Sequence, residues 1–173
     1  MTSRSLLVVL AALAFASAAC TADPVDRDVG LETTFAASMA SSWHYAGDPQ
    51  RVQIGIFGTD RDGTHVVSGG TIDLAFSYFG EDGGADPSAG PEATAEYVPV
   101  PGTDPAGDEP GIATGARGVY EAEDVVFDRA GVWEVTVSAS IDGLAQRLAA
   151  SIQVLETSPI PAPGDRAPRT ETL

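Results

Sequence analysis

The chain has 173 residues, of which 25 are acidic and 9 basic, so its formal net charge is −16. A chain of this length suggests one domain with appendages. Because so acidic a surface repels phosphate groups, the composition argues against nucleic-acid binding and against attachment to anionic lipids by charge.

The amino terminus has the pattern of a secretory signal peptide over residues 1–19, with an apolar run at 6–15 that is too short to span a membrane. The only cysteine, Cys20, follows directly after a series of small residues. This order resembles the lipobox of bacterial lipoproteins. The resemblance implies that Cys20 is lipidated and anchors the protein at the extracytoplasmic face of the cell membrane. The alternative is cleavage a few residues earlier, which leaves Cys20 as a free thiol.

Between the cysteine and the first strands, residues 20–32 are polar and predict a flexible tether. Residues 33–45 allow two interpretations, because their apolar residues fit an interrupted strand while the segment 36–40 also fits a short helix. Strict alternation of apolar and polar side chains then predicts strands at 51–57 and 71–79.

The middle of the chain, residues 80–118, is rich in glycine, proline and acidic residues. A strand at 92–100 is expected at a sheet edge, because Pro99 and Pro101 cannot donate backbone hydrogen bonds to a neighbouring strand. Residues 103–115 contain no aromatic side chain and no apolar run, which favours a disordered loop.

Three closing strands are predicted within residues 119–155, separated by turns at 128–131 and 142–143. Asp-Arg-Ala-Gly and Asp-Gly supply the turn residues, and apolar side chains alternate on both sides of each turn. The sequence therefore predicts an all-β fold, an antiparallel β-sandwich of the immunoglobulin type over residues 33–156, with a proline-rich tail at 157–173. The expected core comprises Val52, Ile54, Ile56, Ile72, Leu74, Phe76, Val126, Trp133, Val135, Val137, Ile152 and Val154.

Four blocks of the sequence resemble an immunoglobulin-like exported domain of actinobacteria and related bacteria: G-D-P-Q-R-V-Q-I-G-I-F, G-T-I-D-L-A-F-S-Y-F-G, G-P-E-A-T-A-E-Y-V-P-V-P-G-T and G-V-Y-E-A-E-D-V-V-F-D-R-A-G-V-W-E-V. In that group the domain often precedes a thioredoxin-like redoxin domain, and the tail resembles the linker that leads into it. The last block is also similar to domains of the YtkA and FixH type, several of which are associated with copper-enzyme assembly. The resemblance implies a redoxin domain as a candidate partner, but the chain has no C-x-x-C motif that would carry redox activity.

The D-x-A-G-x-W segment also resembles the corner of immunoglobulin-like domains, in which an aromatic side chain bonds to the backbone upstream. The resemblance assigns a structural corner to Asp128, Gly131, Trp133 and Tyr120. Tyrosine is usual at the aromatic position. Tryptophan can donate a hydrogen bond there but cannot accept one.

Soft metal ligands are few and poorly spaced. Besides Cys20, the candidates are Met39, His44 and His65, and neither strand nor helix periodicity aligns the first two. A copper site needs two or more such groups to converge, so these three are weak candidates and no metal or other cofactor is predicted.

No catalytic pattern stands out either. The chain has no G-x-S-x-G and no phosphate loop, and the acidic residues at 81–86 lie in a glycine-rich segment that gives no reason for desolvation. We therefore expect a membrane-anchored, non-enzymatic binding or accessory module that presents a surface to another exported protein. The alternatives are an extracytoplasmic copper-handling chaperone and an N-terminal fragment of a redoxin protein.

Overall fold

The computed structural model describes residues 33–104, 106–158, 161, 164 and 166. The predicted signal peptide, Cys20 and the tether lie outside these residues, as does most of the tail. Within the described part, we find no helix of the length and apolar character that a bilayer span requires.

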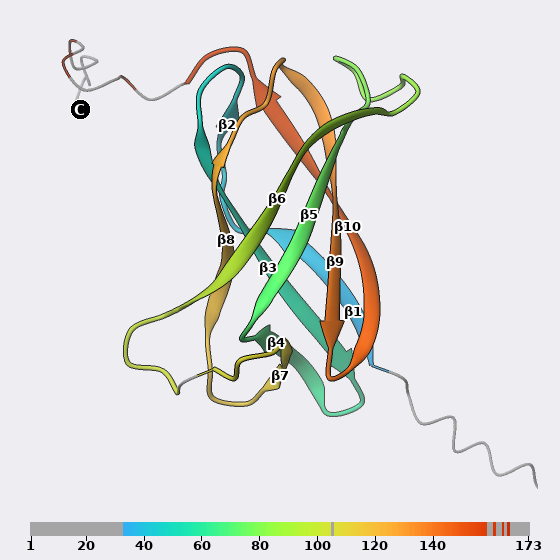
Figure 1. The fold of residues 1–173 in the computed structure, drawn as a ribbon, viewed down its shortest axis with the longest axis vertical. Coiled ribbons are helices and arrows are strands. Elements are labelled where there is room, and N and C mark those ends of the chain that lie inside the picture. Colours follow the sequence, from blue (N-terminus) through green and yellow to red (C-terminus); the bar gives the residue numbers. More distant parts are fainter. Residues whose placement is uncertain (1–32, 105, 159–160, 162–163, 165, 167–173) are drawn as a thin grey trace, which may run out of the picture. The chain divides into compact units, whose positions relative to one another are not determined.

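The described chain is all-β, and its ten strands form one curled, mixed sheet (Figure 1). The strands are β1 (Thr34–Met39), β2 (His44–Tyr45), β3 (Gln50–Asp60), β4 (Gly63–Ser68), β5 (Thr71–Tyr78), β6 (Ser88–Pro99), β7 (Gly111–Ala113), β8 (Gly118–Val125), β9 (Gly131–Ile141) and β10 (Leu144–Leu155). The helical alternative for residues 36–40 is wrong, because residues 36–39 pair with β3 as part of strand β1.

Two layers arise because β6 belongs to both of them. Its first part pairs with β5, its last residues pair with β8, and Glu96 pairs with Thr71 on one side and Glu121 on the other. One layer therefore runs β1-β3-β8-β6 and the other β6-β5-β9-β10-β2, which is consistent with a sandwich-like all-β fold. The strand predicted at a sheet edge is thus internal. Only the end of β6 that contains Pro99 has a neighbouring strand on one side alone, since β8 is the single described strand that pairs with Val98 and Pro99.

Alternating side chains from the two layers fill the core, and every predicted core residue except Val126 is buried. Val126 is 40% exposed, whereas its neighbours Val125 and Phe127 are buried. The reason is a bulge in β8 between Ala122 and Val125, where Asp124 adopts a φ of 56°. One extra residue reverses the alternation of faces, so a strict period of two assigns the wrong valine.

The last hairpin forms as the sequence predicts. Ile141 pairs with Leu144 across a two-residue turn, and Asp142 and Gly143 have φ values of 50° and 79°. Positive φ at both central positions is the condition for the turn type that joins twisted antiparallel strands most tightly.

The described residues of the acidic segment 103–115, which exclude residue 105, include a part that pairs with the sandwich. It contains β7, which pairs with β4, and the Gly70 N–H donates to the Gly107 carbonyl oxygen at 3.2 Å. A glycine turn allows this approach, because a Cβ on Gly69 would lie 2.4 Å from the same oxygen. The prediction of disorder is wrong at β7, since backbone pairing with β4 holds this strand although the segment contains no apolar run.

Candidate functional site

The candidate metal ligands are not brought together in the structure. Met39 lies on β1, His44 is buried on β2, and His65 lies on β4 with its Nε2 3.4 Å from an oxygen of Asp60. His65 pairs with Gly58 near the end of β3, whereas His44 contacts Ser41, whose hydroxyl accepts a hydrogen bond from the Gln53 N–H. The two histidines therefore lie beside points five residues apart on β3, about 17 Å at the usual rise per strand residue. In the part of the chain that the structure describes, no group of three or more His, Cys, Asp or Glu could hold a metal ion.

His44 is a packing residue in the core at one end of the sandwich. It is 2% exposed, its ring meets Phe127 edge-on at 5.8 Å, and its Nε2 lies 3.0 Å from the hydroxyl of Ser41. Its other ring nitrogen, Nδ1, is buried and has no hydrogen-bond partner among the described residues. Burial lowers the pKa of His44, and Gln50 and Ser41 oppose this effect. The fold therefore favours a neutral imidazole here.

Acid should destabilise the domain through this residue. The unfolded chain takes up a proton on His44 below its ordinary pKa of 6.5, whereas the folded chain does so only at a lower pH. Between the two pKa values the unfolded state binds more protons than the folded state. The contribution of His44 to the free energy of unfolding is therefore fully present above pH 6.5 and is lost as the pH falls through that window. Urea unfolding at a series of pH values would measure the loss. The variant His44→Phe should remove this part of the slope and His65→Gln should keep it. The prediction is wrong if His44→Phe leaves the slope unchanged.

The segment that resembles the corner of immunoglobulin-like domains lies at the β8–β9 turn. The Trp133 Nε1–H donates to the Arg129 carbonyl oxygen at 3.1 Å, so a single donor is enough for the corner bond. Asp128 forms an ion pair with the Arg129 guanidinium, which holds the pKa of that carboxyl below its usual value. Gly131 has a φ of +134°, a conformation that other residues rarely adopt.

Tyr120 is not part of this corner. Its hydroxyl donates to the Gly69 carbonyl oxygen at 2.9 Å, and its ring meets Tyr97 at 5.4 Å between centroids. Burial raises the pKa of Tyr120, and Tyr97 acts in the same direction, so the hydroxyl keeps its proton. Tyr120 therefore ties β8 to the β4–β5 turn, at the end of the sandwich opposite the corner (Figure 1).

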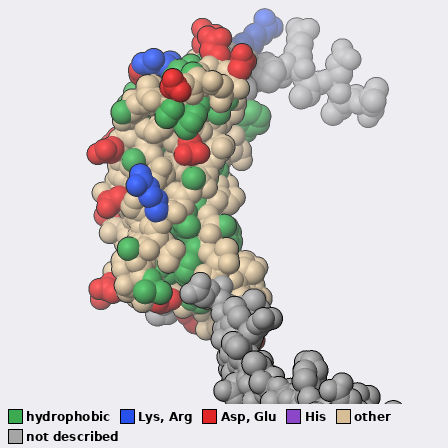
Figure 2. Space-filling model, turned by 90° about the vertical axis from the view of Figure 1, so that its right-hand side faces the viewer, with side chains coloured by type: hydrophobic (Ala, Val, Ile, Leu, Met, Phe, Trp, Pro, Cys, Tyr) green, Lys and Arg blue, Asp and Glu red, His purple; other side chains and the backbone are tan. Residues whose placement is uncertain are grey.

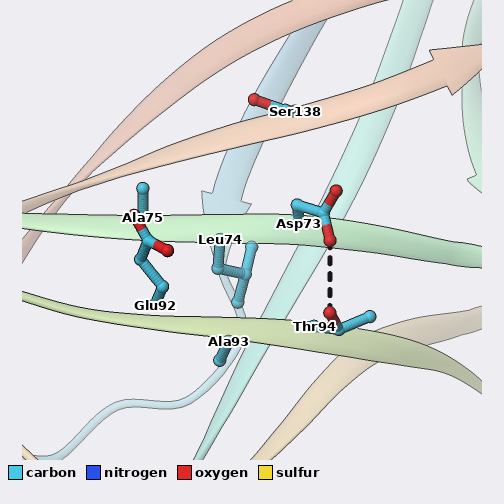
Figure 3. A pocket seen from close by; sticks show the side chains of 7 residues that line it. All are labelled: Asp73, Leu74, Ala75, Glu92, Ala93, Thr94 and Ser138. Carbon is cyan, nitrogen blue, oxygen red and sulfur yellow. Dashed lines mark hydrogen bonds between the residues drawn. The ribbon is translucent and has the colours of Figure 1, made fainter.

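The outer face of the β6-β5-β9-β10 sheet gathers polar groups that the sequence patterns do not single out. Two adjoining hollows of about 530 and 440 Å³ lie on this face, and both are lined by Asp73 and Ser138. Figure 3 shows the first of them, in which Thr94 donates to Asp73 at 3.2 Å and Glu92 lies beside Ala75. The short side chains of Ala75 and Ser138 leave the centre of the sheet face low.

Register explains why these groups meet. Asp73 pairs with Thr94 on one side and with Ser138 on the other, and Ser138 pairs with Arg147. A carboxylate and a guanidinium therefore stand in one row across the face, about 10 Å apart at the usual spacing of two strands. Neither side chain takes part in the ion pairs that the described residues form. The arrangement can bind a ligand with charged groups, and it holds no nucleophile activated by a neighbouring base.

No protein-family model, curated protein or solved structure matches the chain. The resemblance to exported immunoglobulin-like domains therefore remains a prediction from the sequence blocks, and the function has to be argued from the geometry of this face.

Proposed function

We propose that the protein is a non-enzymatic binding or accessory module, held at the outer side of the cytoplasmic membrane by a lipid on Cys20. The observation that carries the proposal is the outer face of the β6-β5-β9-β10 sheet. There, Asp73, Ser138 and Arg147 lie in one row beside two adjoining hollows. This face offers charged groups and space to a partner.

The outer face of the other layer differs in its charged side chains, which form ion pairs with one another, whereas Asp73 accepts a bond from the neutral Thr94 alone and Arg147 is in none of the ion pairs of the described residues. Gln53 donates to Glu121 at 2.6 Å, and Arg51 lies 3.8 Å from Glu121 and 4.0 Å from Glu123. Side chains that already have partners gain less from a new one, so the β6-β5-β9-β10 face is the better candidate for recognition. An exported redoxin domain is a candidate partner that the sequence blocks suggest.

Capture from membranes tests the proposal. The native protein should be found in the membrane fraction and should retain a partner through cross-linking and affinity purification, whereas Cys20→Ala should leave the membrane. Mass measurement of the mature amino terminus should show a lipidated cysteine in the native protein. Recovery of no partner with either form would count against the binding module, and an unlipidated, membrane-free native protein would count against the anchor.

A further inference from the structure

We infer that the hollow between Asp73 and Glu92 receives a lysine or arginine side chain of the partner, so that the partner presents a basic segment to this sheet face. The inference deepens the proposed function and rests on it. The floor of the hollow is low, because Ala75 lies opposite Glu92 and two residues along β5 from Asp73, and Ser138 borders the hollow on β9 (Figure 3).

The shape of the hollow suits a long basic side chain. Lysine and arginine carry three or four methylene groups that can lie along small residues such as Ala75, while the charged head stays at the polar rim. The rim supplies carboxylates from Asp73 and Glu92. Asp73 already accepts one hydrogen bond from Thr94, and a carboxylate has further acceptor sites for a cationic donor.

The net negative charge of the whole face favours a partner whose contacting surface is positively charged. By register, the acidic side chains that point outward from it are Asp73, Glu92, Glu96 and Glu134, and Arg147 is the basic one. The net charge of the chain, −16, adds a long-range attraction for a basic surface. A second copy of this chain would bring like charges together, so self-association through this face is disfavoured.

The lining of the hollow also separates ligand classes. The residues that border it are Asp73, Leu74, Ala75, Glu92, Ala93, Thr94 and Ser138. None of them is aromatic, whereas sugar rings and nucleobases are usually held by stacking on aromatic side chains. A flexible aliphatic stem with a cationic head fits this lining better than a ring.

Another exposed apolar region lies on the flank where β1 and β10 face each other, and it is a weaker candidate. A band of hydrophobic side chains is visible on this flank in Figure 2. The apolar residues that β1 and β10 contribute there, such as Phe35, Met39 and Leu148, are partly buried against the core. They are already used by the fold, and no charged group among them would define a partner.

A short lysine–alanine peptide is the probe, and amide chemical-shift changes with an affinity titration are the measurement. The pair Asp73→Asn and Glu92→Gln should weaken binding about tenfold, because it removes both carboxylates from the rim. Ala75→Gln fills the hollow without changing charge and should weaken binding as much. The control pair Glu81→Gln and Asp82→Asn removes the same charge from the exposed β5–β6 connection and should change affinity about twofold at most.

Shifts confined to Asp73, Ala75, Glu92 and Ser138, with loss in the first two variants alone, would support the inference. Equal loss in the control pair would show diffuse charge attraction, and native-like binding by Ala75→Gln would show that the hollow is not used. Either result overturns the inference, as would a dimer formed through this face in sedimentation. Circular dichroism of each variant verifies that it is folded.

A photo-cross-linker separates this inference from the function it rests on. Placed at Ser138 it should react with the captured partner, and placed at Ser38, on the exposed side of β1, it should not. Reaction at Ser38 alone would still support the proposed binding module, but it would show that the partner does not bind to the β6-β5-β9-β10 face. Reaction at neither position, with no partner captured, would reject the binding module itself.

Discussion

Replacing Trp133 by alanine is expected to destabilise the domain by about 3–5 kcal/mol, the usual cost of emptying a large aromatic site. The residue is 1% exposed and its ring lies 5.1 Å from Tyr78 and 5.2 Å from Phe127. A Cβ on Gly90 would lie 2.3 Å from the ring, so β6 already approaches as closely as a glycine allows. The wall of the site therefore has little freedom to collapse into the space left by alanine.

Urea unfolding followed by circular dichroism measures this effect, and the second tryptophan of the chain, Trp43, provides a control. Trp43 is 57% exposed, so Trp43→Ala should change stability by about 0.5 kcal/mol or less. Trp133→Phe keeps a ring but loses the bond to Arg129, and its cost should lie between the two. If Trp133→Ala cost no more than Trp43→Ala, the corner would not anchor the two layers.

The sequence predicts the strands and most of the core because the alternation of side chains is a local property. Ile54 and Val135 are buried as their patterns indicate, and the Asp142-Gly143 turn has the predicted form. The assignment of Val126 to the core is wrong because a bulge adds one residue, and a bulge depends on the pairing of two distant strands. The same limit applies to the packed 103–115 segment, whose order comes from contact with the β4–β5 turn.

The candidate site could not be predicted from the sequence for a related reason. Asp73 and Glu92 sit on the wet sides of two strands, and their patterns indicate only exposure. Their placement around one hollow depends on the β5–β6 register, which shifts after Ala75 at an irregularity that contains Gly90 and Pro91. The corner is a more local case, because Arg129 and Trp133 are four residues apart. The sequence motif indicates an aromatic corner there, although it does not identify Arg129 as the partner of Trp133.

Gly69→Ala is expected to be among the most damaging changes outside the aromatic core. Gly69 has a φ of +89°, and a Cβ there would lie 2.4 Å from the Gly107 carbonyl oxygen and 2.8 Å from that of Glu109. Both contacts are with backbone, so relief requires a shift of the 103–115 segment or of the turn. The turn is also fixed from the other side, since the Tyr120 hydroxyl donates to the Gly69 carbonyl oxygen.

Gly102→Ala is a matched control, because Gly102 has a φ of +86° and a Cβ added there would meet nothing within 4 Å. It should cost about 1 kcal/mol from backbone strain alone, whereas Gly69→Ala should cost about 2–4 kcal/mol, since overpacking adds to the strain. Hydrogen exchange should also accelerate at the Gly70 amide, which donates to Gly107. Equal costs for the two variants would mean that the segment yields freely to the new methyl group. The acidic loop would then contribute nothing to the stability of the sandwich, although it pairs with β4.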